Sequence, residues 1–398
     1  MRPSVPPVTP AKSSPSVWRR CTSVTSRASW ISRSNKFGRA GAAGVGSSPG
    51  PAPVPILYSK VRPSSVRRNG VAVKLIPVEL RQALPDFNPA NPGAVPPLAL
   101  RYRRFYGLDF EARMPELRVH MGSFKAAGFK LVAQSYLPPQ PRGTVFVVHG
   151  YYDHVGLYQH LIKALLRRGY GVVAFDLPGH GLSSGSRAAI SSFRQYGTVF
   201  NRLLQLARQR MPEPWHVVAQ STGGAVVSEY LLAYAGLEER IPFAGVVFYA
   251  PLIRPVHWFF NRRLHSLVSP FRDFVARKFS DNSNDPEFAR FLREQDPLQP
   301  RHLSAKWVGA LKQWIPYIEH HQPVQFPLYI IQGKCDETVD WQHNIPQFQR
   351  VFPGTQVQYL PKVRHHVVNE LELYRRDVFS RTLKYLDGYP GHPQLAIK

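Results

Sequence analysis

The sequence has 398 residues, 43% of them hydrophobic, which is enough for one large domain or two small ones with a sizeable core. The formal net charge of +26 at pH 7 would suggest an acidic partner if it were evenly spread, but residues 1–78 hold 13 Lys and Arg and no Asp or Glu. Cys21 and Cys335 are too few for a disulfide framework and fit a reducing, cytoplasmic compartment. No apolar run of about 18 residues predicts a transmembrane helix, and the N-terminus lacks the apolar core of a secretory signal.

Residues 1–99 are predicted to form a basic, Pro- and Ser-rich tail and linker without fixed structure. Residues 1–78 show no hydrophobic period, and a Pro-rich stretch follows at 84–100. Removal of residues 1–80 should then leave the stability and activity of the remaining domain almost unchanged. The Arg- and Ser-rich, acid-free composition also resembles an organellar transit peptide, or it could serve for contact with an anionic surface. A nucleic-acid partner is not expected; DNA retention that needs the tail and falls with salt would indicate one.

From residue 100 to 390, strands and helices are predicted to alternate in one domain. A β-hairpin is expected first, at 119–137. The expected strands are 143–150, 171–176, 215–220, 243–250, 326–333 and 357–361. The expected helices are 157–170, 193–210, 222–236 and 369–388. Because the strands are apolar throughout and alternate with helices, the pattern predicts an α/β fold with a mostly parallel sheet covered on both faces.

The alternation stops between residues 252 and 322, which predicts a helical cap inserted into the domain. Within 255–279, apolar residues recur at helical spacing with arginines mostly on the other side, and Pro270 should divide the stretch into two short helices. The apolar side either packs over the sheet or lines a substrate pocket. For the second case the candidate pocket residues are Tyr152, Trp258, Phe271 and Phe274, and the basic side would meet an anionic membrane surface.

Three serines compete for the role of nucleophile. Ser48 in "GSSPG" and Ser183 in "GLSSG" match the G-x-S-x-G pattern strictly, whereas Ser221 in "AQSTGG" matches it only loosely, because Ala219 replaces the first glycine. A nucleophile on this motif must follow a strand directly and open a helix. Ser48 lies in the tail, and Ser183 comes seven residues after its strand, in a glycine-rich loop. Only Ser221 has the required context, so the sequence predicts Ser221 as the nucleophile.

A serine nucleophile needs a base and a carboxylate that orients the base, in the chain order Ser, acid, His. Asp336 follows the strand at 326–333, where the acid belongs, and is better placed than Glu337 or Asp340. His365 and His366 both lie in the final loop before the last helix, so either could be the base. These side chains all come at the C-terminal ends of strands, where such sheets bind ligands.

An oxyanion hole needs two backbone N–H groups that point at the developing negative charge. Thr222, at the start of the helix behind Ser221, is one predicted donor. Tyr151, in the loop "HGYYDH" after an early strand, is the other. Only the backbone amide of Tyr151 is needed, while its side chain would help to form the pocket wall.

Taken together, "HGYYDHVGLYQHL", "AFDLPGHGLSSGSR", "AQSTGG", "IIQGKCDETVD" and "RHHVVNE" resemble successive blocks of the monoacylglycerol lipase and lysophospholipase group of α/β-hydrolases, the serine-aminopeptidase-like hydrolases. The resemblance covers about residues 119–388. It implies that the loop from Asp176 to Gly185 is structural, so Ser183 is not the nucleophile. It also implies that the catalytic residues are Ser221, Asp336 and His365. His366 departs from the group, which generally has an acidic residue after the catalytic histidine.

The sequence therefore predicts an α/β-hydrolase that cleaves carboxylic esters through an acyl-enzyme, without a metal or cofactor. The resemblance implies a monoacyl lipid substrate, such as a monoacylglycerol or a lysophospholipid, and leaves peripheral contact with an anionic membrane open. One alternative is an esterase for small esters or an aminopeptidase-like amide hydrolase. Another is an inactive ligand-binding protein of the same fold. The oligomeric state stays open.

Overall fold

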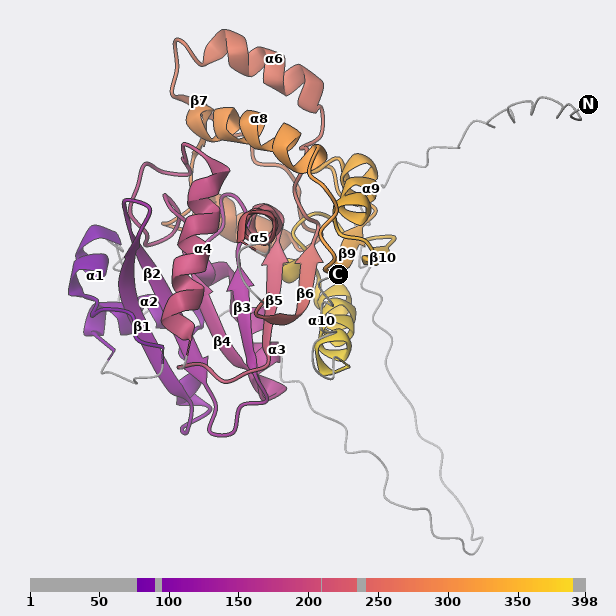
Figure 1. The fold of residues 1–398 in the computed structure, drawn as a ribbon. Helices are drawn as coiled ribbons and strands as arrows, with labels where there is room; N and C mark the ends of the chain where they lie inside the picture. The colour runs from indigo at the N-terminus through magenta and orange to yellow at the C-terminus, as the bar shows by residue number, and fades with distance from the viewer. Residues whose placement is uncertain (1–76, 90–94, 209, 235–240, 389–398) are drawn as a thin grey trace, which may run out of the picture. The chain divides into compact units, whose positions relative to one another are not determined.

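An eight-stranded sheet lies at the centre of the fold (Figure 1). The computed structural model describes residues 77–89, 95–208, 210–234 and 241–388. The strand order is β1-β2-β4-β3-β5-β6-β9-β10; β1 and β4 each pair antiparallel with β2, and the other pairs are parallel. The bounds are β1 Arg118–Ala126, β2 Phe129–Leu137, β3 Thr144–Val148, β4 Gly171–Phe175, β5 Trp215–Gln220, β6 Phe243–Tyr249, β9 Tyr329–Gly333 and β10 Gln356–Leu360.

Helices cover both faces of this sheet. α4, α5, α8 and α9 share one hydrophobic core with it, and α1, α2, α3 and α10 share the other. Their bounds are α1 Pro77–Ala83, α2 Pro97–Tyr106, α3 Gln159–Arg167, α4 Phe193–Ala207, α5 Thr222–Tyr234, α8 Ala305–Glu319, α9 Trp341–Val351 and α10 Glu372–Asp387. Short 3-10 helices lie at Phe110–Ala112, Val155–Tyr158 and Val367–Asn369.

The central strands are apolar on both sides because both of their faces are buried. In β3, Val145 and Val147 pack in one core while Phe146 and Val148 pack in the other. Successive side chains of a strand point to opposite faces, so a strand between two helical layers must be apolar at every position. The predicted hairpin, parallel strands and α/β fold class are therefore confirmed. α1, α2 and α9 were not predicted.

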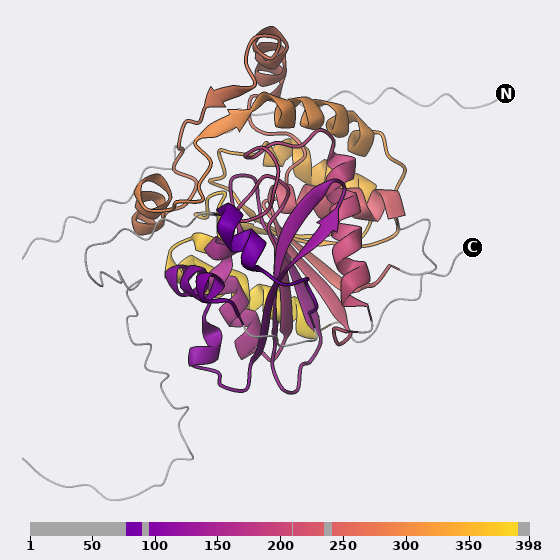
Figure 2. The same ribbon diagram turned by 90° about the vertical axis from the view of Figure 1, so that its left-hand side faces the viewer.

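A cap is inserted between β6 and β9. It contains α6 (Trp258–Val268), β7 (Phe274–Ala276), α7 (Pro286–Glu294) and β8 (His302–Ser304), and it leads into α8. α6 and α8 lie beyond the C-terminal ends of the parallel strands, at the top of Figure 1 and again in Figure 2.

The predicted division of the 255–279 stretch into two helices is wrong in its second half. After α6 ends, β7 pairs antiparallel with β8. A three-residue apolar run cannot be assigned to helix or strand by its spacing, and its strand partner lies in a distant segment.

The predicted unstructured segment 1–99 is wrong for its described C-terminal part. Leu80, Leu84 and Phe87 are buried, and the backbone of Phe87 donates to Ser123 O of β1 at 2.8 Å. The amide of Ser123 donates in turn to Pro85 O at 2.8 Å, so this segment is hydrogen-bonded to the edge of the sheet. Residues 1–76 lie outside the described part of the chain.

Within the described residues, no helix is long and apolar enough to cross a membrane.

Because α1 packs in the core, we expect it to contribute to the stability of the fold, although the sequence predicted that residues 1–80 could be removed with almost no effect. Leu80→Ala should lower the free energy of unfolding by roughly 2–5 kcal/mol, because the side chain is 3% exposed and its removal leaves a cavity. Val78→Ala on the same helix is the control, since Val78 is 50% exposed. Urea unfolding measures both variants, and equal stability of the two would contradict the packing of α1.

Candidate active site

Ser221 lies in a sharp turn between β5 and α5. Its φ of 53° is in the left-handed region, and its amide donates to Tyr249 O of β6 at 2.8 Å. Glycine is required two positions later, because a Cβ on Gly223 would lie 2.3 Å from Val148 O of β3. Ala219 is fully buried where the motif usually has glycine. Ala219 therefore satisfies the need for a small residue, and the strained turn holds the Ser221 side chain at the end of the strand.

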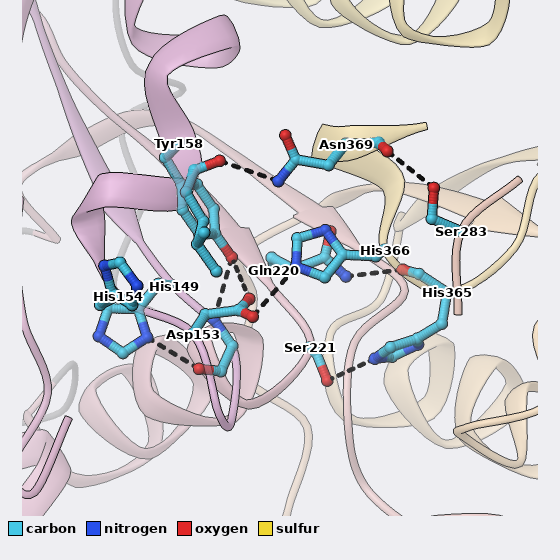
Figure 3. A network of polar contacts seen from close by, with 12 residues as sticks. His149, Asp153, His154, Tyr158, Gln220, Ser221, Ser283, His365, His366 and Asn369 are labelled. Carbon is cyan, nitrogen blue, oxygen red and sulfur yellow. Dashed lines mark hydrogen bonds and ion pairs between the residues drawn. The ribbon is translucent and has the colours of Figure 1, made fainter. Parts of the chain in front are cut away.

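Ser221, His365 and Asp336 form a continuous hydrogen-bonded chain. His365 Nε2 lies 2.9 Å from Ser221 Oγ, and His365 Nδ1 lies 2.8 Å from Asp336 Oδ2. Figure 3 shows Ser221 and His365 facing each other, and Gln220 Nε2 donates to His365 O at 2.8 Å. A carboxylate can only accept, so Nδ1 carries the proton toward Asp336 and Nε2 is left to accept from the serine hydroxyl.

The carboxylate of Asp336 is fixed by several donors in the loop after β9. Asp336 Oδ1 accepts the amides of Thr338 at 2.8 Å and Val339 at 3.1 Å. Asp336 Oδ2 accepts Gln332 Nε2 at 3.1 Å in addition to His365. Donors on both oxygens hold the carboxylate in one orientation, and this orientation sets that of the imidazole.

The loop after β3 lies against the serine turn. A Cβ built on Gly150 would be 3.3 Å from Ser221 Cβ, and Gly150 N donates to Tyr158 Oη at 3.0 Å. The Gly150 amide is therefore occupied. The amides of Tyr151 and Thr222, the two predicted donors, have no hydrogen-bond acceptor among the loop and side-chain contacts of the described residues. Thr222 is the first residue of α5, where a helix leaves its amides unpaired.

Ser183 has a different role. Its Oγ donates to Asp176 O at 2.6 Å, and no contact joins it to His365 among the described side chains. The carboxylate of Asp176 accepts the amides of Val155 and Leu182, each at 2.8 Å, and so ties two loops together. These contacts fit a structural loop. Ser48 lies outside the described residues.

A second carboxylate–imidazole pair lies beside the first and was not predicted. His366 Nε2 lies 3.0 Å from Asp153 Oδ1, and Tyr158 Oη donates to Asp153 Oδ2 at 2.9 Å (Figure 3). Burial acts to raise the pKa of Asp153, but His366, His149 and these hydrogen bonds outweigh it, and the pKa is lowered. Asp153 is therefore a carboxylate that accepts from His366. The two neighbouring histidines are thus held by different acids, and only His365 contacts Ser221.

A cavity of about 170 Å³ opens at Ser221, below the cap. It is lined by Gly150, Tyr151, Tyr152, Asp153, Gln220, Ser221, Thr222, Leu252, Pro255, Arg277, Lys278, Ser280, Asn282, Leu303, Trp307, Thr338, Val339, His365 and His366. Ligand pockets are commonly about 300–1,000 Å³, so this cavity is small.

Of the four predicted pocket residues, only Tyr152 lines the cavity. Trp258 is buried in the core beneath the cap, whereas Phe271 is 84% exposed and Phe274 is 40% exposed at the outer surface. The three predictions were wrong because the helical spacing identifies an apolar side but does not say where that side points. Here α6 is joined to α8 through His265 and Ala305 O, and much of its apolar side faces solvent.

The aromatic wall of the cavity comes from α8 instead. The ring of Trp307 stacks on that of Tyr151 with a centroid distance of 3.9 Å, and Tyr151 Oη donates to Ala188 O at 2.8 Å. Sequence reasoning missed Trp307, and no spacing signal distinguishes it from the core residues of the same helix. Among the described residues, no group of three or more His, Cys, Asp or Glu side chains could hold a metal ion.

Comparison with known proteins identifies the family of this chain. A family model described as serine aminopeptidase, S33, matches residues 139–372. A monoacylglycerol lipase of Mycolicibacterium smegmatis is 33% identical, with 65% of this chain and 95% of that protein aligned. Phospholipase YtpA of Bacillus subtilis is 24% identical, with 63% of this chain and 97% of that protein aligned.

Solved structures extend the likeness to the fold. The monoacylglycerol lipase of Paleococcus ferrophilus superposes with a TM-score of 0.57 at 20% identity, covering 65% of this chain and 99% of that one. The family model spans more than half of the sequence and includes the turn at Ser221 and the loops of Asp336 and His365. The chain therefore belongs to the serine aminopeptidase S33 family of α/β-hydrolases, in the group that contains the monoacylglycerol lipases.

Proposed function

We propose that this hydrolase cleaves the carboxylic ester of a single-chain lipid through an acyl-enzyme on Ser221. The hydrogen-bonded chain Asp336–His365–Ser221, open to a cavity below the cap, is the observation that carries the proposal. The names of two relatives, a monoacylglycerol lipase and a phospholipase, support a lipid ester as the substrate class.

In the first half of the reaction, Ser221 Oγ attacks the ester carbonyl carbon while His365 Nε2 takes the hydroxyl proton. The carbonyl oxygen becomes an oxyanion, for which the free amides of Tyr151 and Thr222 are the donors. The bond to the alcohol then breaks, and His365 returns the proton to the leaving oxygen. Asp336 orients His365 and stabilises the imidazolium whenever it forms.

In the second half, a water molecule attacks the acyl-serine. His365 takes a proton from the water and later gives it to Ser221 Oγ, so the carboxylic acid leaves and the serine is restored. No other reactant is needed for this cycle.

The outer side of the cap supports contact with a lipid surface. Five large apolar side chains of α6 and the following turn are exposed: Phe259, Phe260, Leu264, Leu267 and Phe271. Arg262, Arg263 and Arg272 are exposed on the same segment. Monomeric proteins rarely expose such a cluster without a partner, and an apolar and basic helix can lie in the interface of an anionic membrane.

A second candidate function is hydrolysis of small esters. The observation in its favour is the cavity volume of about 170 Å³, which leaves little room for a long acyl chain unless the cap moves. The lipid proposal therefore requires that α6 and β7 move away from the sheet, or that the chain extends over the apolar cap surface.

The nucleophile is tested by two serine variants. Ser221→Ala should lower kcat on a p-nitrophenyl ester by several orders of magnitude, because the attacking oxygen is lost. Ser183→Ala is the control and should keep most of the activity per folded molecule, since the Ser183 hydroxyl contacts only backbone groups of Asp176 and of Val132 in β2. Labelling with a fluorophosphonate should likewise be lost in Ser221→Ala and retained in Ser183→Ala. An inactive Ser183→Ala beside an active Ser221→Ala would reverse the assignment.

The base is tested by the two neighbouring histidines. His365→Ala should be nearly as inactive as Ser221→Ala, because the two side chains act as a unit. His366→Ala should lose less activity but more stability, roughly 3–5 kcal/mol, because it leaves the buried carboxylate of Asp153 without its imidazole partner. Active-site titration and urea unfolding separate these effects. Full activity of His365→Ala would transfer the role to His366.

The substrate class is tested by an acyl-chain series. Catalytic efficiency on monoacylglycerols should rise from about four carbons to ten or more, because each buried CH₂ contributes roughly 0.8 kcal/mol. Anionic vesicles at low salt should raise the rate further.

The matched variant for that series is Phe271→Asp, which changes the exposed side of the cap and no residue of the cavity. It should remove the vesicle effect and leave the rate on short soluble esters unchanged. A flat or falling chain-length profile that does not respond to vesicles would favour the small-ester function.

A further inference from the structure

The cavity at Ser221 has a cationic side. Arg277 and Lys278 line it together with Ser280 and Asn282 of the same segment. This segment runs along the histidine side of the site, since His366 N donates to Asn282 O at 2.7 Å. The apolar lining comes from other segments, with Leu252 after β6 and Trp307 on α8 among its members. Neither positive side chain takes part in the chemistry proposed above.

Arg277 is held in one place by aromatic rings. Its guanidinium carbon lies 3.9 Å from the ring centroid of Tyr152 and 4.4 Å from that of Phe279. Stacking between rings fixes the plane of a guanidinium and favours the cation. Tyr152 belongs to the loop that carries the predicted oxyanion donor Tyr151, so the charge of Arg277 is fixed next to the reacting centre.

A chain of buried polar groups anchors Arg277 further. Arg277 Nη1 donates to Gln299 Oε1, and Gln299 Nε2 donates to Asp296 Oδ2 at 2.9 Å. Asp296 also pairs with His154 Nε2 at 3.0 Å and accepts from Tyr106 Oη at 2.7 Å. Burial acts to raise the pKa of Asp296, but His154 and the hydrogen bonds lower it to about 2. Asp296 therefore stays ionised at neutral pH and keeps its hydrogen bonds to Gln299 and His154.

The positive charges of Arg277 and Lys278 at the cavity are not neutralised by any carboxylate of the described residues. Among the described residues, no carboxylate lies within ion-pair distance of Arg277 or Lys278, and Arg277 makes side-chain hydrogen bonds through Nη1 alone. Asp153 is the only cavity-lining residue of the described chain with a carboxylate, and its two oxygens are engaged by His366 and Tyr158. Nε and Nη2 of Arg277 thus remain for a ligand.

We propose that Arg277, with Lys278, selects esters that carry an anionic group, a phosphate or a carboxylate, over neutral esters of the same chain length. This proposal rests on the proposed ester hydrolysis and adds the chemistry that the substrate must carry. A fixed guanidinium with free N–H groups matches the geometry of phosphate and carboxylate oxygens. Gln299 acts as a positioning residue, because it holds the guanidinium and does not reach the cavity lining.

Two matched pairs of esters test this preference with the full chain. Lauroyl-glycerol phosphate and monolauroylglycerol differ only in an anionic group on the alcohol. The p-nitrophenyl hemiester of succinic acid and p-nitrophenyl butyrate differ in an anionic group on the acyl part. The measured quantity is the ratio of kcat/KM for the anionic to the neutral ester in each pair, below micelle concentrations and at low salt.

Wild type should prefer the anionic member of at least one pair, and Arg277→Gln should reduce that ratio about tenfold to hundredfold, the range for a lost hydrogen bond to a charged group. The rate on the neutral member should change less than about threefold, which also shows that the variant folds. Gln299→Leu should reduce the ratio in part and mainly through KM. Arg101→Gln removes the same charge from the exposed surface of α2, outside the cap, and should leave the ratio unchanged.

The pair in which the ratio falls identifies whether the alcohol or the acyl part carries the anion. The inference is overturned if wild type cleaves both members of each pair equally well, or if Arg277→Gln and Arg101→Gln lower the ratio alike. Failure of the wild type to cleave any of the four esters would instead overturn the proposed function, and labelling of Ser221 by a fluorophosphonate would show whether the nucleophile is still reactive.

Discussion

The left-handed backbone at Ser221 is the constraint on which the rest of the site depends. The strain of φ 53° persists because three central strands meet there: β5 leads into the residue, β6 accepts its amide through Tyr249 O, and β3 leaves room only for a glycine at position 223. The same contact with β3 brings the loop of Tyr151 to the serine. One packed turn thus holds Ser221 at the end of β5 and brings the loop of the predicted donor Tyr151 next to it.

Strand ends supply the remaining parts of the site. Asp336 follows β9, and His365 follows β10, the next strand in the sheet. Because parallel strands end at one edge, residues separated by 29 and 144 positions in the chain come within hydrogen-bond distance. For this reason the sequence sufficed to select Ser221 and Asp336 and to reduce the base to two neighbouring histidines: each choice needed only a correctly identified strand and its first loop residues. His365 and His366 could not be separated by that argument, since the choice depends on Asp153, which lies 213 positions from His366.

Other features of the structure could not be predicted from the sequence, because they depend on contacts between segments that lie far apart in the chain. Leu80, Leu84 and Phe87 are single apolar residues in a Pro-rich segment, too few to show a period, and only the edge strand β1 gives them a place to pack. β7 needs its partner β8, which lies beyond α7. The pocket residues were misassigned for the same reason. An amphipathic pattern identifies two sides of α6, but tertiary packing decides which of them faces the sheet.

The cap and the loop after β3 are joined through polar contacts rather than through an apolar interface alone. Asp296 and Gln299 of the cap connect His154 of the loop after β3 to Arg277 of the segment after β7. Arg277 in turn stacks on Tyr152, beside the predicted oxyanion donor. Breaking these buried contacts would leave further polar groups without partners, at a cost in free energy, so the network favours one arrangement of the cap segment near the loop. The outer helix α6 has no such anchor to the loop in the described structure. Movement of the cap would therefore affect α6 more readily than the cationic side of the cavity, and a long acyl chain could be admitted while the position of Arg277 is kept.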